Sequence, residues 1–140
     1  MTADSLMVEA CAARSLPRLT DDNRSFWTSG SSGRLHVPRC QSCRRYVLPA
    51  SLTCSTCGGS TTPEPVSGRA AVFTWTVNEH QFHPDIPPPT IIAIVVLDEQ
   101  DDLRLATNLV DCRPADVRIG LPVSVRFEDH GEIFYPVFAP

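Results

Sequence analysis

The sequence predicts a mainly β protein: a short N-terminal helix, a zinc ribbon, and then a five-stranded barrel of the OB-fold type. Two observations carry this prediction. Two Cys-x2-Cys pairs lie in the first half of the chain, and short segments of alternating apolar and polar residues fill the second half. The 13 prolines and 7 glycines favour turns and short strands over a helical bundle. We expect an N-terminal arm and helix over residues 1–33, the ribbon over 34–64 and the barrel over 65–140.

The N-terminal part is expected to be an arm followed by one short helix. Residues 1–19 have no sustained period, so we expect this arm to become ordered only against a partner or a neighbouring domain. The run TDDNRSFWTS from Thr20 then offers a cap and two early carboxylates, which favour a helix start. Phe26 and Trp27 supply the apolar anchor of the helix. They either close the ribbon against the barrel or form an interface that binds a partner.

Four cysteines, in the segments CQSC and CSTC, give the strongest site signal: Cys40, Cys43, Cys54 and Cys57. Two Cys-x2-Cys turns can present four thiolates to one point and complete a tetrahedral shell around zinc. Backbone N–H groups of each turn should face sulfur, with Gly58 easing the chain reversal after the second pair and Arg44 in the equivalent place after the first. Four thiolates leave no position for an activated water, so we predict a structural Zn2+. Iron would fit the same ligand set.

Five strands are expected after the linker that contains Pro63, Pro65 and Gly68. The second of them is the apolar segment TIIAIVVL, and an acidic turn at 98–102 joins it to the third in a hairpin. Alternation defines the expected buried faces of the others: Phe73, Trp75 and Val77 in the first strand; Leu103, Leu105, Thr107 and Leu109 in the third; Val123, Val125 and Phe127 in the fourth; Ile133, Tyr135 and Val137 in the fifth. Five short strands with little helix between them fit a small closed barrel.

Charge and hydropathy restrict the possible functions. The net charge of −4, from 12 basic and 16 acidic residues, provides no general attraction for a polyanion. The longest apolar run, residues 91–97, is far shorter than the roughly 20 residues of a membrane-spanning helix. The first twenty residues lack the basic start and apolar stretch of a secretory signal, so we expect a cytoplasmic protein with reduced cysteines.

Several short segments occur in a fixed order along nearly the whole chain. They are SFW at 25–27, GRL at 33–35, PRC at 38–40, the two cysteine knuckles, GRA at 68–70, FTWT at 73–76, PTIIA at 89–93, TNLVDC at 107–112 and IGLPV at 119–123. This series resembles the acyl-CoA-associated DUF35 family of zinc-ribbon plus OB-fold proteins. The order makes the match specific, because zinc ribbons alone occur in many unrelated proteins. The chain departs from the family at Arg44, where glycine is frequent, and at Ser55, where proline is common.

Proteins of this family look like non-catalytic partners of thiolase-superfamily enzymes, including lipid-transfer-protein-like aldolases and ketothiolases. Some occur beside or fused to MaoC-type hydratases in steroid side-chain degradation. The resemblance implies an accessory subunit that binds a thiolase-like aldolase or thiolase and helps complete its acyl-CoA site, in retro-aldol cleavage of a steroid-derived thioester. A MaoC-type hydratase is a further implied partner. Catalysis would then reside in the partner, because the sequence contains no recognisable nucleophile and base signature.

Seven residues are candidates for contact with the acyl-CoA: Arg69, Phe73, Trp75, His80, His83, Arg126 and Tyr135. The aromatic rings would stack on adenine or pack along pantetheine, and the arginines would meet phosphate. Each has an ordinary alternative, namely core packing for the aromatic residues and a solvated surface position for the charged ones. The alternative function is single-stranded nucleic-acid binding, which zinc ribbons and OB-folds also serve. The scattered arginines, outnumbered by acidic residues, count against it.

Overall fold

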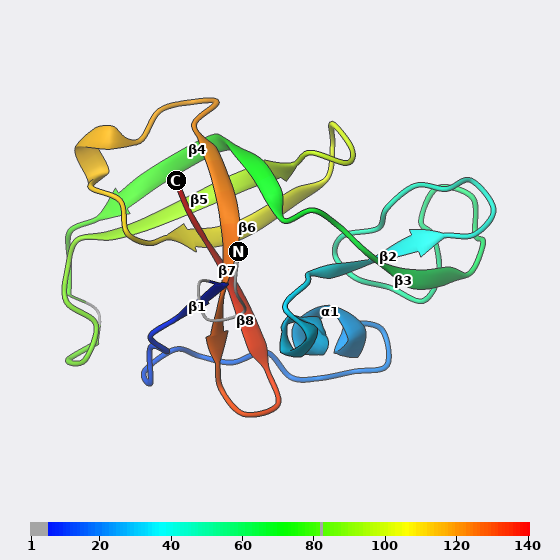
Figure 1. The fold of residues 1–140 in the computed structure, drawn as a ribbon, viewed down its shortest axis with the longest axis horizontal. Coiled ribbons are helices and arrows are strands. Elements are labelled where there is room, and N and C mark those ends of the chain that lie inside the picture. The colour runs from blue at the N-terminus through cyan, green and yellow to red at the C-terminus, as the bar shows by residue number, and fades with distance from the viewer. Residues whose placement is uncertain (1–5, 82) are drawn as a thin grey trace.

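The computed structural model describes residues 6–81 and 83–140, which form a barrel with a two-stranded ribbon at one side (Figure 1). Helix α1 lies next to the ribbon strand β2 and the barrel strand β8. The elements in chain order are β1 (Met7–Val8), α1 (Arg24–Thr28), the 3-10 helix η2 (Ser29–Ser32), β2 (His36–Cys40), β3 (Thr61–Pro65), β4 (Arg69–Asn78), β5 (Thr90–Leu97), β6 (Arg104–Leu109), the 3-10 helix η3 (Pro114–Asp116), β7 (Pro122–Asp129) and β8 (Phe134–Ala139). No helix in the described ranges is long and apolar enough to cross a membrane.

The five strands β4 to β8 form a closed barrel, as the sequence predicts. The strand order is β7-β4-β5-β6-β8, and the pairing of β7 with β8 closes the ring. Neighbours are antiparallel except for β6 and β8, which pair in parallel where Leu109 meets Phe138. The predicted hairpin between β5 and β6 is confirmed over six residue pairs, from Ile91–Leu109 to Val96–Arg104. Closure removes exposed strand edges, which is the usual solution for a small antiparallel sheet.

Alternating apolar residues fill the barrel interior. In β5 the side chains of Ile91, Ala93, Val95 and Leu97 are buried, which confirms this segment as the central core strand. The expected inward faces of β6 and β7 are also confirmed, with Phe127 fully buried. In β8 the simple alternation fails, because the last four residues of the strand are all buried. This strand is therefore covered on both faces.

The expected buried face of β4 is wrong at Phe73. A β-bulge interrupts its pairing with β5, since the register passes from Val72–Val95 directly to Thr74–Ile94. The extra residue at the bulge breaks the alternation, and Phe73 is left 44% exposed, while Trp75 and Val77 beyond it are half-buried. The guanidinium of Arg104 covers the ring of Phe73, 4.2 Å from its centroid.

Helix α1 begins later than the sequence suggests. Its N-cap is Asn23, and no acidic residue lies in its first turn, so the expected role of Asp21 and Asp22 in that turn is wrong. A reciprocal pair of hydrogen bonds fixes the preceding turn: Thr20 N–H donates to Asn23 Oδ1 at 2.7 Å, and Asn23 N–H donates to Thr20 Oγ1 at 3.3 Å. Asp22 instead accepts a 2.8 Å hydrogen bond from the backbone N–H of Leu52, which connects the turn to the ribbon.

The arm packs against the barrel over its described part, residues 6–19. Strand β1 pairs in parallel with the second half of β7, where Met7 meets Phe127 and Val8 meets Glu128. This fits the expectation that the arm becomes ordered against a neighbouring domain; its first five residues lie outside the described ranges.

The helix and the base of the ribbon share one apolar core with the barrel. Phe26, Leu35 and Val37 belong to the same buried cluster as Phe127. Close approach is possible because residue 30 is glycine: a Cβ there would lie 2.5 Å from Phe127 Cδ1. The shared core fixes the ribbon relative to the barrel.

Candidate metal centre and surface groove

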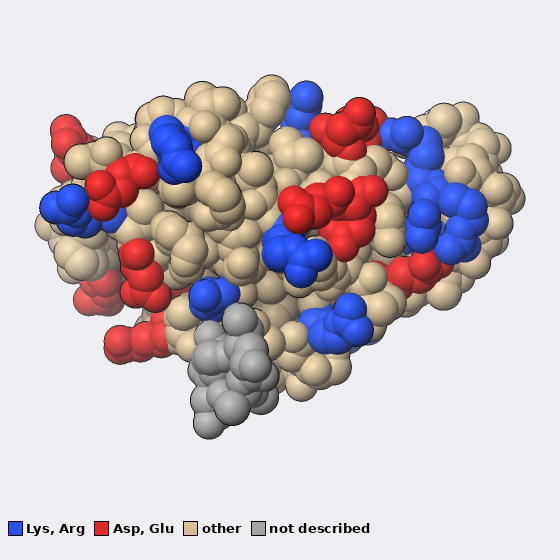
Figure 2. Space-filling view, turned by 45° about the horizontal axis from the view of Figure 1, so that its top comes forward, with Lys and Arg blue, Asp and Glu red and all other residues tan. Residues whose placement is uncertain are grey.

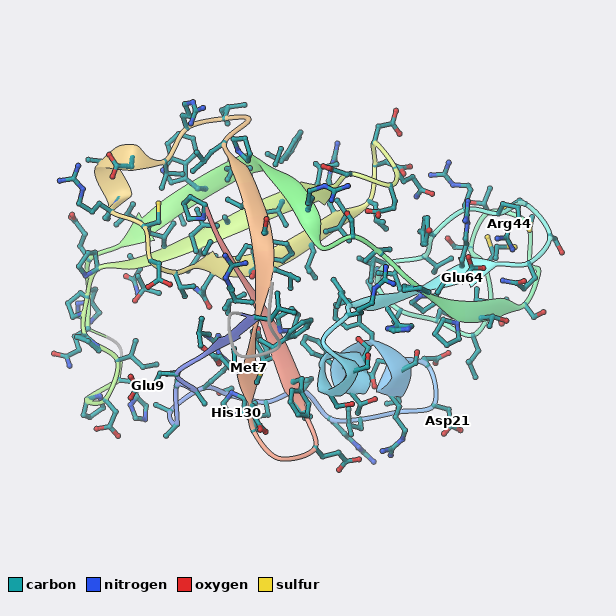
Figure 3. The ribbon with its side chains drawn as sticks, in the orientation of Figure 1. Met7, Glu9, Asp21, Arg44, Glu64 and His130 are labelled. Carbon is teal, nitrogen blue, oxygen red and sulfur yellow. The ribbon has the colours of Figure 1, made fainter. Side chains whose placement is uncertain are left out.

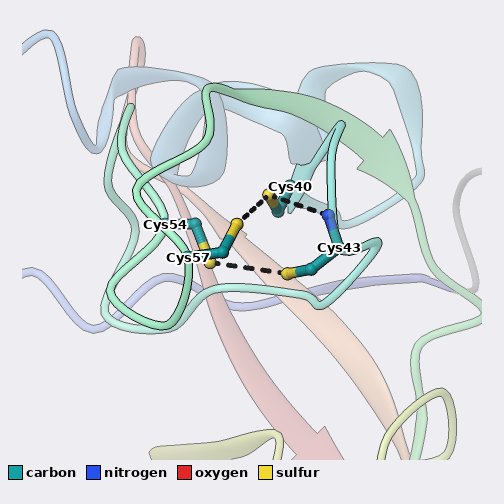
Figure 4. A group of neighbouring side chains, drawn as sticks. All are labelled: Cys40, Cys43, Cys54 and Cys57. Atoms are coloured by element: carbon teal, nitrogen blue, oxygen red, sulfur yellow. Dashed lines mark hydrogen bonds between the residues drawn. The ribbon is translucent and has the colours of Figure 1, made fainter.

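The four predicted ligands converge at the far end of the ribbon (Figure 4). All four sulfur atoms lie within 4.8 Å of one another. The Sγ atoms of Cys40 and Cys57 are 3.4 Å apart, and those of Cys43 and Cys54 are 3.7 Å apart. A tetrahedral shell with zinc–sulfur bonds of about 2.3 Å separates its sulfurs by roughly 3.8 Å. The cluster therefore has the size and donor set of a closed four-thiolate metal site.

Two similar knuckles hold the sulfurs. Backbone N–H groups of Ser42 and Cys43 donate to the sulfur of Cys40, those of Thr56 and Gly59 donate to Cys54 and Cys57, and each distance is 3.4 Å. This confirms the expected donation from backbone to sulfur, which stabilises thiolates.

The residue that reverses the chain after each knuckle is in the left-handed region. Arg44 has φ +67° and donates its backbone N–H to Cys40 O at 3.0 Å; Gly58 has φ +77° and donates to Cys54 O at 2.9 Å. The predicted equivalence of these two positions is confirmed. Glycine adopts this conformation without penalty, whereas arginine adopts it at a cost in free energy.

Side chains around Glu64 support the first knuckle. Glu64 lies on β3 opposite β2 and accepts hydrogen bonds from Gln41 and Arg44, each at 3.1 Å, with Arg39 at 3.5 Å (Figure 3). The hydrogen bond from Gln41, followed by the charges of Arg44 and Arg39, lowers the pKa of this carboxyl. The two ribbon strands are thus joined by polar contacts next to the metal centre.

Cys40 and Cys43 hold their protons unequally. Cys40 is fully buried, and N–H donation from Cys43, helped by Ser42, lowers its pKa to about 6. At Cys43 a hydrogen bond from Arg45 acts in the lowering direction, but burial and the neighbouring sulfurs outweigh it and raise its pKa to about 11. Such a cluster retains protons that a bound metal displaces, since a metal takes the thiolate form.

A groove of about 980 Å³ lies on the outside of the barrel, and none of the four clustered cysteines lines it. The arm forms one wall, and the loop before β5, strand β6 and the segment after β6 form the others. Ile92 and Ala106, both exposed, line its apolar part, while Arg14 and Glu128 lie in its polar part. The volume is that of a small-molecule site.

The polar part of the groove is a buried ion-pair network. Glu128, at the end of β7, is only 3% exposed, and it binds Arg14 of the arm through Nε–Oε1 at 2.6 Å and Nη2–Oε2 at 3.0 Å. Arg14 also donates to Asn108 Oδ1 at 2.8 Å, and His130 Nε2 lies 3.0 Å from Glu128 Oε1. Figure 3 labels Met7 of β1, which pairs with Phe127 of β7, and His130, which follows the end of β7. Burial acts to raise the pKa of Glu128, but the hydrogen bonds from Arg14 and His130 outweigh it and lower the pKa.

Two of the seven predicted ligand contacts, His83 and Tyr135, line this groove. Of the other five, Arg69 is exposed and lies 3.6 Å from Asp98, and Arg126 donates to Val125 O on its own strand. Trp75 is half-buried in β4, Phe73 lies under Arg104, and His80 is exposed in the following loop. The assignment of all seven residues to acyl-CoA stays a prediction.

The aromatic pair of α1 connects the helix to the groove. Phe26 is buried in the shared core, as closure of the ribbon against the barrel requires. Trp27 is half-buried and stacks on Tyr135, with ring centroids 5.2 Å apart and planes at 25°. The guanidinium of Arg14 lies 4.3 Å from the centroid of the same tyrosine ring. A role for Phe26 and Trp27 in partner binding stays a prediction.

Sequence patterns did not indicate the Arg14–Glu128 network. Its two partners are 114 positions apart, and Glu128 occupies an outward position in the alternation of β7, where a carboxylate is ordinarily solvated. The unpatterned arm that carries Arg14 gave no signal of its own.

A rubredoxin-like ribbon followed by a closed OB-fold barrel defines the class of this protein. The family model of the ChsH2 rubredoxin-like zinc ribbon domain matches residues 27–64, and that of the ChsH2 C-terminal OB-fold domain matches residues 63–128. The chain belongs to this DUF35 family of zinc-ribbon plus OB-fold proteins.

Two relatives have described functions. Over 131 residues the chain is 32% identical to the "Probable enoyl-CoA hydratase alpha subunit" of Thermomonospora curvata. This match covers 92% of the chain but only 40% of the relative, so the chain spans two fifths of that protein's length. A "DUF35 domain-containing scaffold protein" of Methanocaldococcus jannaschii is 30% identical over 105 residues, which cover 69% of this chain and 74% of the relative.

Two solved structures have the same architecture. A chain of the "Ltp2-ChsH2(DUF35) aldolase" superposes with a TM-score of 0.79 at 31% identity, covering 89% of this chain and 98% of that one. A DUF35 protein of unknown function from Sulfolobus solfataricus superposes with a TM-score of 0.61 at 14% identity over 85% of this chain and 84% of that one, and this likeness concerns the fold alone.

Proposed function

We propose that this protein is a non-catalytic accessory subunit that binds a thiolase-like aldolase or thiolase and helps complete its acyl-CoA site. The observation that carries the proposal is the likeness to the ChsH2 chain of an aldolase, which extends over 98% of that chain at 31% identity. The description of the Methanocaldococcus relative as a scaffold protein supports the same role.

The chemistry of the described residues supports a partner that supplies the catalytic groups. Four thiolates fill a tetrahedral metal shell, which leaves no position for a reactive water. In the groove, Glu128 is already bound by Arg14 and His130, and its lowered pKa makes it a weak base. The cysteine cluster and the groove are therefore suited to holding other groups in position.

The metal of the ribbon is proposed to be structural zinc. Its part would be to hold the ribbon, and with it helix α1, in a fixed position for docking. Metal analysis of protein purified without added metal checks the identity, with one zinc per chain expected and iron as the contrary result.

The family resemblance and one relative support a proposal for the substrate class. We propose retro-aldol cleavage of a steroid-derived acyl-CoA thioester in the cytoplasm, with a MaoC-type hydratase as a second partner. The relative described as an enoyl-CoA hydratase subunit supports the hydratase association, because this chain matches only part of that longer protein.

Single-stranded nucleic-acid binding is the less favoured alternative. Figure 2 shows basic and acidic side chains interspersed over one face, with basic ones also gathered at the ribbon end. There Arg44 binds Glu64 and Arg45 binds Asp102, so part of the basic charge is neutralised. A groove for a polyanion requires uncompensated charge along its length.

Coexpression with the thiolase-like protein encoded nearest to this chain tests the proposal. We expect the two proteins to copurify at fixed stoichiometry and to cleave a β-hydroxyacyl-CoA together, while neither does so alone. Absence of a complex, together with full activity of the thiolase-like protein by itself, would refute it. Salt-dependent binding of single-stranded DNA would instead favour the alternative.

A further inference from the structure

We propose that the groove beside Arg14 and Tyr135 binds a neutral, mainly apolar molecule through an acceptor oxygen such as a ketone or thioester carbonyl. Three properties of the groove lead to this ligand class: its apolar wall, its accessible hydrogen-bond donors and its charge. None of them involves the metal centre.

The wall on β5 and β6 exposes apolar surface that the fold itself does not cover. Ile92 is 43% exposed although its neighbours in β5, Ile91 and Ala93, are almost fully buried. Ala106 lies diagonally across from it on β6, in register with Ile94, and is also exposed. Ile86 and Pro89 extend the same wall. Apolar lining around a few polar groups is typical of small-molecule sites.

The polar part of the groove offers donors. Tyr135 makes no side-chain hydrogen bond to any residue in the described ranges, and no buried side-chain oxygen there lacks a partner, so its hydroxyl is accessible. Arg14 uses three of its five N–H groups, on Glu128 and Asn108, and has N–H groups left to donate. Contacts with Trp27 and Arg14 hold the tyrosine ring in place. These donors match a ligand oxygen that only accepts.

The charge of the groove disfavours an anion. Both of its arginines are paired with carboxylates: Arg14 with Glu128, and Arg113 with Asp116. Glu9 and Asp111 also line the groove and make no ion pair within the described part of the chain, so the local balance is negative. A phosphate or carboxylate would be desolvated next to these groups, and no unpaired arginine among the described residues of the groove would meet it. A neutral carbonyl avoids this penalty.

The groove would therefore take the acyl end of a thioester and leave the CoA phosphates to other surfaces. This last step rests on the proposed function, whereas the ligand class follows from the groove alone. Binding by the isolated chain needs no partner enzyme, so its failure is distinct from a failure to form an aldolase complex.

The experiment is calorimetric titration of the purified full-length, metal-loaded chain with two probes that share one alkyl tail. Methyl undecyl ketone and dodecanoate carry the same undecyl group and differ in whether the oxygen-bearing end is neutral or anionic. We expect saturable 1:1 binding of the ketone, weaker binding of dodecanoate by about fivefold or more, and no displacement by free coenzyme A.

Variants locate the binding. Ala106→Phe fills the groove at a position whose own side chain takes no part in the ion-pair network, and it should weaken ketone binding at least about tenfold. Ala115→Phe makes the same change at an exposed position of η3 that does not line the groove, and it should leave binding unchanged. Tyr135→Phe keeps the stacked ring and should weaken binding by about two- to tenfold through the lost donor.

Three results would overturn the proposal. They are no saturable binding of the ketone, tighter binding of dodecanoate than of the ketone, and equal binding by the wild type and Ala106→Phe. Circular dichroism of each variant separates loss of binding from loss of folding.

Discussion

The ribbon and the barrel are held together by different forces. The barrel interior is a continuous cluster of buried apolar side chains, many of them almost inaccessible, such as Val95, Phe127 and Phe138. The far end of the ribbon buries only one residue besides two of the cysteine ligands, namely Val47. A segment this poor in apolar contacts depends on its metal, whereas the barrel depends on packing.

Because of this difference, the barrel core and the metal each fix a different end of the ribbon. The base of the ribbon shares the barrel core through Leu35 and Val37, so the barrel sets the direction of the ribbon. The metal then fixes the far end, where the knuckles lie. Loss of metal should disorder that end and leave the barrel folded.

The largest expected effect is at the metal centre. Cys57→Ser removes one ligand, and apparent binding free energies of structural zinc are roughly 10–16 kcal/mol, so the variant should lose metal and the order of the ribbon end. Elemental analysis and amide hydrogen exchange measure both. Cys112→Ser is the matched control, because Cys112 is half-buried outside the cluster and should keep full metal content. Metal loss accompanied by barrel unfolding would contradict the separation of the two parts.

A pair of phenylalanines tests the barrel core and the bulge in β4. Phe127→Ala opens a cavity at a fully buried site and should lower the free energy of unfolding by about 3–5 kcal/mol. Phe73→Ala, at the bulge, should lower it by roughly 1 kcal/mol or less, because that ring is 44% exposed. Urea denaturation compares them. Equal losses would mean that Phe73 is buried, as the simple alternation predicted.

The attachment of the arm should depend on pH. The pKa of Glu128 is lowered in the folded protein, so its contribution to stability is present above the ordinary glutamate value of 4.5 and is lost as the pH falls through the lower folded value. Glu128→Gln should release the arm at neutral pH, at a cost of about 1.5–3 kcal/mol for hydrogen bonds to a charged group. Hydrogen exchange of residues 7–14 measures the release. Identical protection in the variant and the wild type would show that the ion pair does not hold the arm.

The smallest effect concerns the two chain reversals of the ribbon. Arg44→Gly relieves a left-handed arginine, worth about 1–2 kcal/mol, but loses a surface ion pair with Glu64 worth about 0–1 kcal/mol. Slight stabilisation with retained metal is expected. Gly58→Ala should destabilise by roughly 1 kcal/mol, since open space surrounds that position and only the backbone penalty remains. Thermal melts of the metal-loaded proteins show whether each variant is more or less stable than the wild type.

Local patterns predicted the knuckles and the barrel strands because both obey short-range rules. The spacing of the cysteines places four sulfurs together, and alternation in β6 and β7 gives the buried faces. A bulge has no comparable signature, so the exposure of Phe73 could not be foreseen. Helix α1 begins later than predicted because Thr20 and Asn23 hydrogen-bond to each other. Helix propensity alone does not indicate this pair of hydrogen bonds.

The groove could not be predicted from the sequence because of the topology of the fold. Its walls come from the arm, from β6 and from the loop before β5, which only the closed barrel brings together. The sequence pattern places Glu128 at a solvated strand position, whereas in the structure Arg14 covers it. Aromatic and basic residues alone therefore suggested ligand contacts at Arg69, Phe73 and Trp75, none of which lines the groove.

The most direct test is reconstitution of enzyme activity with the proposed thiolase-like partner. Wild-type chain and partner, mixed in equal amounts, should cleave a β-hydroxyacyl-CoA that neither cleaves alone. Cys57→Ser should fail to restore activity while its barrel stays folded. A fully active complex formed with the metal-free variant, or a partner that is fully active by itself, would contradict the claim that a metal-fixed ribbon positions this subunit on its enzyme.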